Sequence, residues 1–295
     1  MERKSRIFSL VYIPVLVLFS VYLLLDTFVI GRVYQQVEPS VTTAPQQTVP
    51  AEPVISQNSY YDGNISITLT EYREHDTNIY VADIQLSSPE ALKTGLANGS
   101  YGRNIKQTTS QMATANNAIL AINGDYYGAR ESGYVIRNGT LYRDRASDRQ
   151  ALVIDDQGNF TVLEEQSRSA QSLLGDGARQ VLSFGPGLIV DGQICVSRYD
   201  EVDQATHSNP RTAIAQVGEL HYLMVVSDGR TSRSEGLSLY QMAEFLQGLG
   251  AKTAYNLDGG GSSTMWFNGR VVNEPVNRGS KISERSVSDI VYIGA

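Results

Sequence analysis

Polar residues capable of chemistry follow three apolar runs of the sequence, each at the point where the run ends. The runs are Ala118–Ile122, Leu220–Val226 and Ala254–Leu257, and they lead into NGDYYG, SDGR and DGGGSST. Strand ends often carry ligand-binding groups, because a rigid sheet holds loop residues there that its interior would not tolerate. Three consecutive glycines also let the backbone approach a ligand closely and point successive N–H groups at an anion. The pattern therefore predicts one shared site that combines carboxylates, an arginine and backbone amides.

Simpler interpretations of these loops stay open at this point. The glycine-rich segment after Asp258 has the composition of a flexible turn, and Asp228-Gly229 alone would make an ordinary turn. No lysine follows the triple glycine, so the loop is not the phosphate-binding loop of ATP- or GTP-hydrolysing enzymes. Clustered aspartates leave Ca²⁺ binding open, although no metal or other cofactor is predicted. The coincidence of three such loops at equivalent strand ends favours a site.

The elements that must position these loops are mostly strands. Alternating or continuous apolar residues predict strands at 64–71, 78–86, 118–122, 212–217, 220–226 and 254–257. A short helix is predicted at 108–117. A longer helix is predicted after Ser238, which forms a capping box with Gln241, and it ends at Gly248 to Gly250.

Turn residues between apolar runs predict several hairpins. Asn138-Gly139 and Asn268-Gly269 are typical of tight turns, and similar hairpins are expected around 155–159 and at Asp191-Gly192. Cys195, in the last of these, is expected to be a packed side chain rather than a nucleophile. Strands outnumber helices, so we expect an α+β fold with a mixed β-sheet core, several hairpins and a few flanking helices.

The first sixty residues predict a membrane anchor and a linker. Residues 7–25 carry no charge, and a helix of this length, at ~1.5 Å per residue, matches the hydrocarbon core of a bilayer. We expect a transmembrane anchor at 7–30, with residues 1–6 cytoplasmic because Arg3, Lys4 and Arg6 precede the span. A cleaved signal peptide is the alternative, but its apolar core would be shorter. Residues 31–59 form a linker rich in Pro, Thr and Gln, and 60–295 form one domain on the cell exterior.

Composition and charge exclude several classes of function. The chain of 295 residues has 24 Lys and Arg against 31 Asp and Glu, a net charge of −7, so nucleic acid is not an expected partner. One cysteine allows no internal disulfide and no thiolate-rich zinc site. An anionic ligand must therefore be held by a few placed arginines.

Several segments together resemble the phosphodiester glycosidase family. They are AINGDYYG, SFGPGLIVDG, NPRTAIA, the stretch from SDGR to NLDGGGSST, and SERSVSDIVYI, and they span about 118–293 in the family's order. The resemblance implies hydrolysis of a sugar from a sugar-1-phosphodiester, and bacterial members are often membrane-anchored proteins related to exopolysaccharides. Many members have Asn-Gly-Gly-Phe-Phe where this chain has Asn-Gly-Asp-Tyr-Tyr at 123–127. Asp125 is thus an added carboxylate that alters substrate choice or adds a catalytic or cation-binding group.

The resemblance also implies roles for individual residues. Asp258 and Asp228 would be the carboxylate pair that acts at the anomeric carbon, with Asp125 as a third candidate. Their separation would indicate the stereochemical course, about 6.5–9.5 Å for inversion and about 5–5.5 Å for retention. Arginines and loop amides would stabilise the charge of the leaving phosphate. The expected substrate-binding residues are Asn123, Gly124, Arg211, Arg230, Gly259, Gly260, Gly261, Ser262, Ser263, Glu284 and Arg285.

Some of these residues have an equally simple structural interpretation. Glu284 and Arg285 also fit a surface ion pair, and Asn123 would bond backbone groups at its strand end. Tyr126, Tyr127 and Trp266 would stack on sugar rings or pack in the core.

Two functions therefore follow from the sequence. The first is an extracytoplasmic hydrolase that cleaves the glycosyl-phosphate bond of sugar-1-phosphodiesters in surface glycans. The alternative is a non-catalytic module that binds surface glycans or assists exopolysaccharide assembly. The intact acidic and basic residues of the three loops favour the enzyme.

Overall fold

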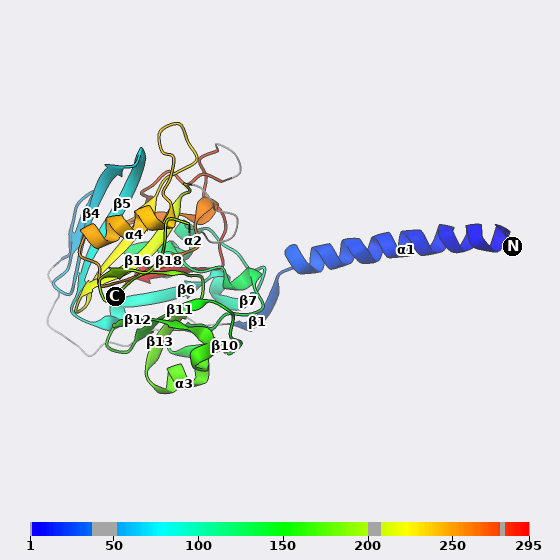
Figure 1. Ribbon diagram of the computed structural model, residues 1–295, viewed down its shortest axis with the longest axis horizontal. Helices are drawn as coiled ribbons and strands as arrows, with labels where there is room; N and C mark the ends of the chain where they lie inside the picture. Colours follow the sequence, from blue (N-terminus) through cyan, green and yellow to red (C-terminus); the bar gives the residue numbers. More distant parts are fainter. Residues whose placement is uncertain (1, 37–51, 200–207, 278–280, 295) are drawn as a thin grey trace.

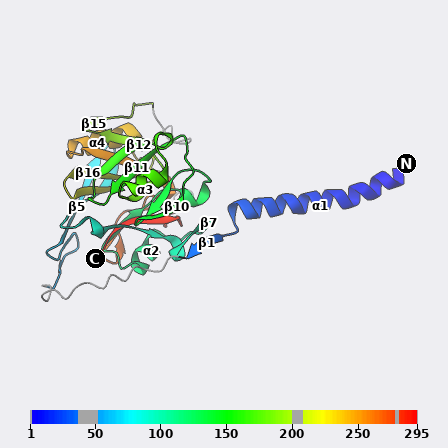
Figure 2. The ribbon, with the colours of Figure 1, turned by 90° about the horizontal axis from the view of Figure 1, so that it is seen from below.

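The N-terminal helix stands apart from the rest of the chain. The computed structural model describes residues 2–36, 52–199, 208–277 and 281–294, with side chains from residue 12 onward. Helix α1 (Glu2–Phe28) projects from the globular part of the protein in both views (Figures 1 and 2). Within the part of the chain that the structure describes, no helix has the length and apolar character needed to cross a membrane. The helix is confirmed, and its predicted membrane-spanning role is not confirmed.

Strands form most of the globular part. A nine-stranded sheet contains, in spatial order, β15 (Gln193–Ile194), β14 (Gly187–Val190), β18 (Thr253–Leu257), β16 (Arg211–Gly218), β17 (His221–Ser227), β5 (Thr77–Leu86), β4 (Ile65–Glu74), β3 (Ser59–Tyr61) and β2 (Val54–Ile55). A five-stranded sheet contains β10 (Thr140–Arg143), β9 (Val135–Arg137), β13 (Ala178–Leu182), β11 (Gln150–Asp155) and β12 (Phe160–Glu164). Another contains β20 (Arg270–Val271), β19 (Met265–Phe267), β8 (Leu120–Asn123), β21 (Asp289–Ile293) and β6 (Leu92–Leu96). A two-stranded sheet pairs β1 (Arg32–Gln36) with β7 (Ser100–Arg103).

Short helices complete the architecture. They are α2 (Thr109–Ala115), α3 (Ala170–Gly175), α4 (Leu239–Gly248) and the 3₁₀ turns η1 (Pro89–Ala91), η2 (Ala97–Gly99), η3 (Tyr127–Ala129), η4 (Glu165–Ser167) and η5 (Gly260–Ser262). The predicted α+β class is confirmed. The paired strands of the described residues are all antiparallel, however, so the sheets are not mixed in direction. Hairpins join many sequence neighbours, and a hairpin makes an antiparallel pair.

Local sequence signals explain many of these elements. Asn138 and Gly139 both have positive φ, 50° and 77°, as the tight turn between β9 and β10 requires. Helix α4 has the capping box predicted at Ser238 and Gln241. Cys195 is exposed rather than packed, because β15 lies at the edge of its sheet.

The nine-stranded sheet is covered on both faces. Helix α4 lies across one face (Figure 1) and packs Met242 and Leu246 against apolar side chains of β5, β16 and β17. The opposite face packs on both five-stranded sheets, in a core that contains Ile84, Leu257 and Ile122. This burial is the main source of stability and fixes the strand ends that carry the polar loops.

The predicted linker contributes strands in the part that the structure describes. Strand β1 pairs with β7, and β2 and β3 extend the edge of the nine-stranded sheet beside β4. Residues 37–51 of the linker lie outside the described part. The large sheet therefore begins at Val54, before the predicted boundary at residue 60.

Candidate active site

Strand pairing brings two of the polar loops to one edge of the nine-stranded sheet. Strand β16 lies between β17 and β18 and is antiparallel to both. Its first residue, Arg211, pairs with the last residue of β17, and Thr212 pairs with Leu257, the last residue of β18. Asp228 and Asp258 follow these strands directly. The two loops therefore leave the sheet on either side of Arg211.

The third loop comes from a different sheet and is fastened to the other two by Asn123. The Asn123 amide donates to the backbone oxygen of Asp258 at 2.6 Å. Its side-chain oxygen accepts from the hydroxyl of Thr212 at 2.9 Å and from the backbone N–H of Thr264 at 3.2 Å. Asn123 is buried and its polar atoms are engaged, so it positions the Asp258 loop rather than presenting a group to substrate.

Asp258 is the carboxylate around which the loops converge. Its Oδ2 accepts from the Ser262 hydroxyl at 2.5 Å and from Nη2 of Arg285 at 3.2 Å. Burial raises the pKa of Asp258, while the charge of Arg285 and the Ser262 hydrogen bond act against that shift. A raised pKa brings a carboxyl closer to neutral pH, where it works well as an acid or base.

The triple glycine packs directly against arginines. A Cβ on Gly260 would lie 3.0 Å from Nη2 of Arg230, and one on Gly261 would lie 3.4 Å from Cδ of Arg285. A Cβ on Gly259 would lie 2.9 Å from the carbonyl oxygen of residue 210 and 3.8 Å from Cα of Arg211. Larger residues would displace these side chains. The glycines thus allow the loop to lie close to guanidinium groups, but the predicted cradle of free amides is not seen: the N–H groups of Gly260 and Ser262 donate to the carbonyl oxygens of Pro210 and Gly259 at 2.7 and 3.2 Å.

Arg230 and Arg211 are held in place by polar groups of the same region. Arg230 has a φ of +60°, which is unfavourable for a residue with a side chain. Its Nε and Nη2 donate to Asn209 Oδ1 at 2.9 and 2.8 Å. Arg211 is buried and donates from Nε to the carbonyl oxygen of Leu237 at 2.8 Å.

Two further cationic residues that sequence reasoning did not assign to the site, Arg130 and Lys106, add to this region. The guanidinium groups of Arg130 and Arg285 both lie over the Tyr126 ring, 5.6 and 5.9 Å from its centroid. Partial burial lowers the pKa of Lys106, as does the charge of Arg285, while Asp258 acts in the opposite direction. Lys106 and Arg130 therefore add positive charge to this region, while burial and the negative charge of Asp125 raise the pKa of Asp258.

Asp228 occupies a separate hydrogen-bond network beside this region. Its Oδ2 accepts from the Tyr80 hydroxyl at 3.1 Å, and its Oδ1 accepts from the Glu274 N–H at 2.9 Å and the Asn273 amide at 3.3 Å. Asn273 also donates to the carbonyl oxygen of Ser263 at 3.0 Å, which links Asp228 to the glycine-rich loop. Burial raises the pKa of Asp228 to about 6, partly offset by these hydrogen bonds.

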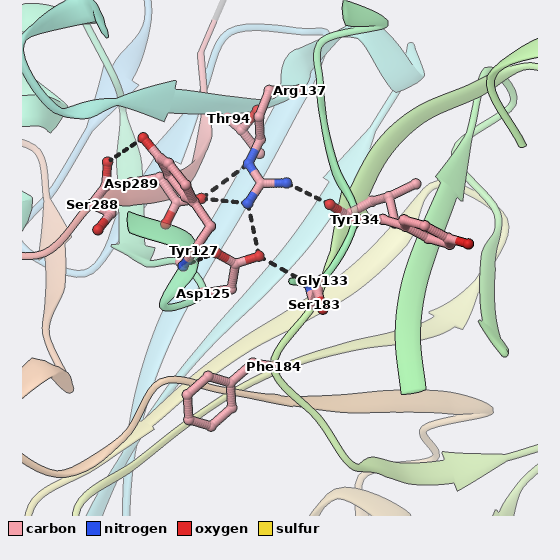
Figure 3. A network of polar contacts seen from close by, with 12 residues as sticks. Thr94, Asp125, Tyr127, Gly133, Tyr134, Arg137, Ser183, Phe184, Ser288 and Asp289 are labelled. Atoms are coloured by element: carbon pink, nitrogen blue, oxygen red, sulfur yellow. Dashed lines mark hydrogen bonds and ion pairs between the residues drawn. The ribbon is translucent and has the colours of Figure 1, made fainter. Parts of the chain in front are cut away.

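Asp125 belongs to a buried network around Arg137 (Figure 3). Arg137 donates from Nη2 to Asp125 at 2.8 Å, and from Nε and Nη2 to Asp289 at 3.0 and 2.8 Å. Asp125 also accepts from the backbone N–H groups of Tyr127 and Ser183, each at 2.9 Å. Both oxygens of Asp125 are thus engaged inside the protein, so this carboxylate supports the loop and the structure does not direct it at substrate.

Asp289 is the second carboxylate of this network. One of its oxygens, Oδ1, has no hydrogen-bond partner among the described residues. Burial, together with the charge of Asp125, raises the pKa of Asp289 to about 8, against the attraction of Arg137. A Cβ on Gly124 would lie 2.4 Å from this Oδ1. Gly124 therefore allows close packing against Asp289, where no side chain would fit.

Glu284, predicted to bind substrate, lies at the start of α2. It accepts from the Ser110 backbone N–H at 2.9 Å and from the Ser110 hydroxyl. A carboxylate at a helix N-terminus satisfies donors that the helix leaves open. Ser263 is fully buried, and its hydroxyl has no hydrogen-bond partner among the described residues. Tyr127 and Trp266 are buried in the core, and Tyr126 is partly exposed beside the arginines.

The residues that sequence reasoning missed are mostly partners from distant segments. Arg137 left a signal, because it follows two apolar residues in a strand pattern, and a charged residue there is buried only with a partner. Lys106 and Asp289 left none. No group of three or more Asp, Glu, His or Cys side chains suited to a metal ion is found in the described part of the chain.

Comparison with known proteins identifies relatives over most of the chain. A family model described as phosphodiester glycosidase matches residues 116–294, more than half of the chain. The protein is 30% identical to YomE, an SPbeta prophage-derived protein of Bacillus subtilis, over 65% of this chain and 30% of that protein. It is 34% identical to N-acetylglucosamine-1-phosphodiester alpha-N-acetylglucosaminidase of Mus musculus, over 32% of this chain and 21% of that enzyme. The matched segments span less than a third of these curated relatives.

Solved structures share the fold. The zebrafish N-acetylglucosamine-1-phosphodiester alpha-N-acetylglucosaminidase catalytic domain, auto-inhibited by its pro-peptide, superposes with a TM-score of 0.60 at 20% identity. That match covers 78% of this chain and 83% of the zebrafish domain. A hypothetical protein from Synechocystis gives a TM-score of 0.62 at 16% identity, over 79% of this chain and 62% of that one. At these identities the likeness establishes the fold.

Proposed function

This chain belongs to the phosphodiester glycosidase family, and from that premise we propose that it hydrolyses the bond between a sugar's anomeric carbon and the phosphate of a phosphodiester. The name of the mouse relative specifies an N-acetylglucosamine-1-phosphodiester, and we propose this class as the first substrate to test. The observation that carries the proposal is Asp258, a buried carboxylate with a raised pKa, held between Ser262 and Arg285 beside a glycine loop.

The site's charges suit a reaction in which phosphate leaves. Phosphate is a good leaving group, so stabilising its charge matters more than protonating it strongly. Arg230 and Arg285, which pack on Gly260 and Gly261, would hold the phosphate oxygens. Lys106 adds positive charge beside Arg285. The net charge of the whole chain is negative, so this local concentration of cations is specific to the site.

The carboxylates would act at the sugar. Asp258 would meet the anomeric carbon as its positive charge develops, either by attacking it or by activating a water molecule. Asp228 would be the second carboxylate, and its pKa of about 6 allows it to carry a proton at mildly acidic pH. Asp125 is not part of this proposal, because Arg137, Tyr127 and Ser183 already engage its oxygens.

A hydrolysis assay tests the proposal. The full chain is incubated with the methyl ester of N-acetyl-α-glucosamine-1-phosphate, and the release of reducing sugar is measured. We expect release by the wild type and a loss of about 10³-fold or more in Asp258→Asn, as is usual when a reacting carboxylate is removed. Asp156→Asn, an exposed aspartate in the turn between β11 and β12, is the matched control and retains activity.

The same assay distinguishes hydrolysis from the alternative function, a non-catalytic glycan-binding or polymer-assembly module. No release from a panel of α-linked hexosamine and hexose phosphodiesters would favour a glycan-binding or polymer-assembly module. Equal release by wild type and Asp258→Asn would remove Asp258 from its role.

The cellular context stays a prediction from the sequence. The uncharged run at 7–25 after three basic residues supports our proposal of a single-pass protein with its C-terminal domain outside the cell, acting on surface glycans. Protease treatment of intact cells tests this placement: digestion of the C-terminal domain supports it, and protection until the cells are lysed contradicts it.

A further inference from the structure

The turn between β4 and β5 packs on the segment that carries Arg230. The hairpin tip, residues 73–78, contains the end of β4, the turn and the start of β5, and the Arg230 loop, residues 228–237, follows β17. The hairpin tip precedes residue 116, where the family match begins, so it lies outside the matched part of the chain. Hydrogen bonds join the two segments at several places, and these bonds decide how Arg230 is held.

Backbone groups of the hairpin tip hold the Arg230 loop near both of its ends. At the start of the loop, the Asp228 N–H donates to the carbonyl oxygen of Asn78 at 3.0 Å. Near its end, the Glu235 N–H donates to the carbonyl oxygen of Asp76 at 3.1 Å. The Asn78 N–H donates to the Ser234 hydroxyl at 3.0 Å. The course of the loop is therefore fixed by a strand pair that lies outside it.

Thr77 makes the most deeply buried of these contacts. The residue is fully buried, and its hydroxyl accepts from the Gly236 N–H at 2.9 Å. The carbonyl oxygens of Gly236 and His75 both lie 3.0 Å from the hydroxyl oxygen as acceptors for its proton. A Cβ on Gly236 would lie 2.4 Å from the carbonyl carbon of Asn209, so the glycine also packs directly on that residue. Gly236 thus connects Thr77 to Asn209.

The contacts of the hairpin tip lead to Arg230 by two routes. Glu235, whose N–H is bound to the tip, accepts from the Arg230 N–H at 3.1 Å. Asn209, on which Gly236 packs, accepts from Nε and Nη2 of Arg230 at 2.9 and 2.8 Å. The same Nη2 lies 3.0 Å from the position of a Cβ on Gly260, in the Asp258 loop. The tip therefore supports both the backbone and the guanidinium of Arg230 where the guanidinium meets the candidate active site.

We infer that Thr77 is a positioning residue, which acts through Gly236 and Asn209 to direct the Arg230 guanidinium at the phosphate of the substrate. This inference rests on the proposed function and assigns part of the site to the hairpin of β4 and β5. Arg230 is exposed, and an exposed arginine loses rotamer freedom when it binds a ligand. Holding the guanidinium in place beforehand lowers that entropic cost and so favours binding of the phosphate.

A double-mutant cycle tests whether Thr77 acts through Arg230. Thr77→Val keeps the shape of the side chain without its hydroxyl, and we expect kcat/KM for the methyl ester of N-acetyl-α-glucosamine-1-phosphate to fall about tenfold. Thr77→Ser keeps the hydroxyl and should stay within about twofold of the wild type. In the Arg230→Met protein, Thr77→Val should have no further effect, because the group that it positions is already gone. Thr68→Val, the same change at an exposed position of β4, is the matched control and keeps the wild-type kcat/KM.

Two results of this cycle would overturn the inference. One is a kcat/KM of Thr77→Val equal to that of the wild type. The other is a tenfold fall that Thr77→Val causes equally with and without the Arg230 guanidinium, because independent effects are additive.

Amide hydrogen exchange separates this inference from the proposed function, since it needs no cleavage. Mass spectrometry of the full chain should show exchange at least about tenfold faster for residues 229–237 in Thr77→Val, with the rest of the chain unchanged. Ser234→Ala removes the acceptor of the Asn78 N–H and should also speed exchange of this loop, so it decides the question if Thr77→Val does not fold. If the wild type cleaves no ester, the proposed function fails, while the exchange rates still decide whether the tip holds the Arg230 loop. Wild-type exchange of the loop in the folded variants, or equal acceleration along the whole chain, would contradict the inference.

Discussion

The Arg137 network and the Asp258 region both pair arginine with aspartate, but they use this pair for different purposes. In the Arg137 network, one guanidinium lies between two carboxylates, and the side chains of Arg137, Asp125 and Asp289 are at most 1% exposed. In the Asp258 region, the Arg285 side chain is 38% exposed and that of Asp258 12%. The first network has no access to solvent, and because the pKa of Asp289 is raised to about 8, Arg137 and one proton balance its two carboxyl groups near neutral pH. The second network has an open side, with Arg285 beside Asp258. Burial and access, rather than residue type, distinguish a structural ion pair from a reactive one.

The largest effect that tests this contrast is expected from Arg137→Met. Removing the guanidinium leaves two buried carboxylates without a cation, and we expect the free energy of unfolding to fall by about 3–5 kcal/mol. Urea denaturation measures it, with Arg179→Met on the exposed side of β13 as the matched control. A loss below about 1 kcal/mol would mean that Arg137 does not hold the network together.

The same substitution in the other region, Arg285→Met, should leave the fold nearly unchanged and impair catalysis. The ion pair with Asp258 is partly exposed, so we expect less than about 1 kcal/mol of stability to be lost. We expect kcat/KM to fall by about 10²-fold or more, because a guanidinium that stabilises the leaving phosphate is removed. Arg285 also lowers the pKa of Asp258, so without it the acid limb of the pH–rate profile should move to higher pH. Reduced stability with full activity would reverse the proposed division between the two regions.

An effect of intermediate size is expected on the pH dependence of stability, because Asp289 holds a proton in the folded state. Its folded pKa of about 8 lies above the unfolded value of about 3.9, so the folded state binds more protons between these limits. Stability therefore falls as the pH rises through this range. Asp289→Asn should remove this dependence, which amounts to about 2 kcal/mol between pH 6 and pH 8. Asp228, with a pKa of about 6, passes from about half to almost fully ionised over the same range in both proteins.

Urea denaturation of the wild type and Asp289→Asn at pH 6, 7 and 8 measures the difference. Comparing the two proteins cancels the contributions of other titrating groups. Parallel pH dependences would show that Asp289 is ionised throughout, and the charge balance of the Arg137 network would need another explanation.

Sequence reasoning succeeded where the signal is local. The Asn138-Gly139 turn and the capping box of Ser238 and Gln241 depend on neighbours within a few residues. The pairing of β16 with β17 follows from their short connection, whereas β18 pairs with β16 only after β17 and α4 intervene in the chain. The two pairings together bring Asp228 and Asp258 to one edge. For these elements, the sequence contains nearly all the information required.

Sequence reasoning failed where the role of a side chain depends on a partner far away in the sequence. Asp125 and Asp258 each lie in a polar motif that follows a buried strand. Nothing in the neighbouring sequence reveals that Arg137 engages Asp125. Asp289 meets Arg137 across 152 residues. Asp125 is therefore a structural carboxylate that the sequence alone presents as a catalytic candidate.

The smallest effect is expected at Glu284. This residue adjoins Arg285 in sequence, but its carboxylate is bound to the start of α2. Glu284→Gln weakens the bonds to Ser110 at the start of α2, and we expect a loss of about 0.5–1 kcal/mol in the free energy of unfolding. The kcat/KM should stay within about twofold of the wild type, since the carboxylate contacts α2 and not the Asp258 loop. Urea denaturation and the reducing-sugar assay on the same protein measure both. A fall in kcat/KM as large as that of Arg285→Met would place Glu284 among the groups that act on substrate, and it would show that contact with a helix does not exclude a role in the site.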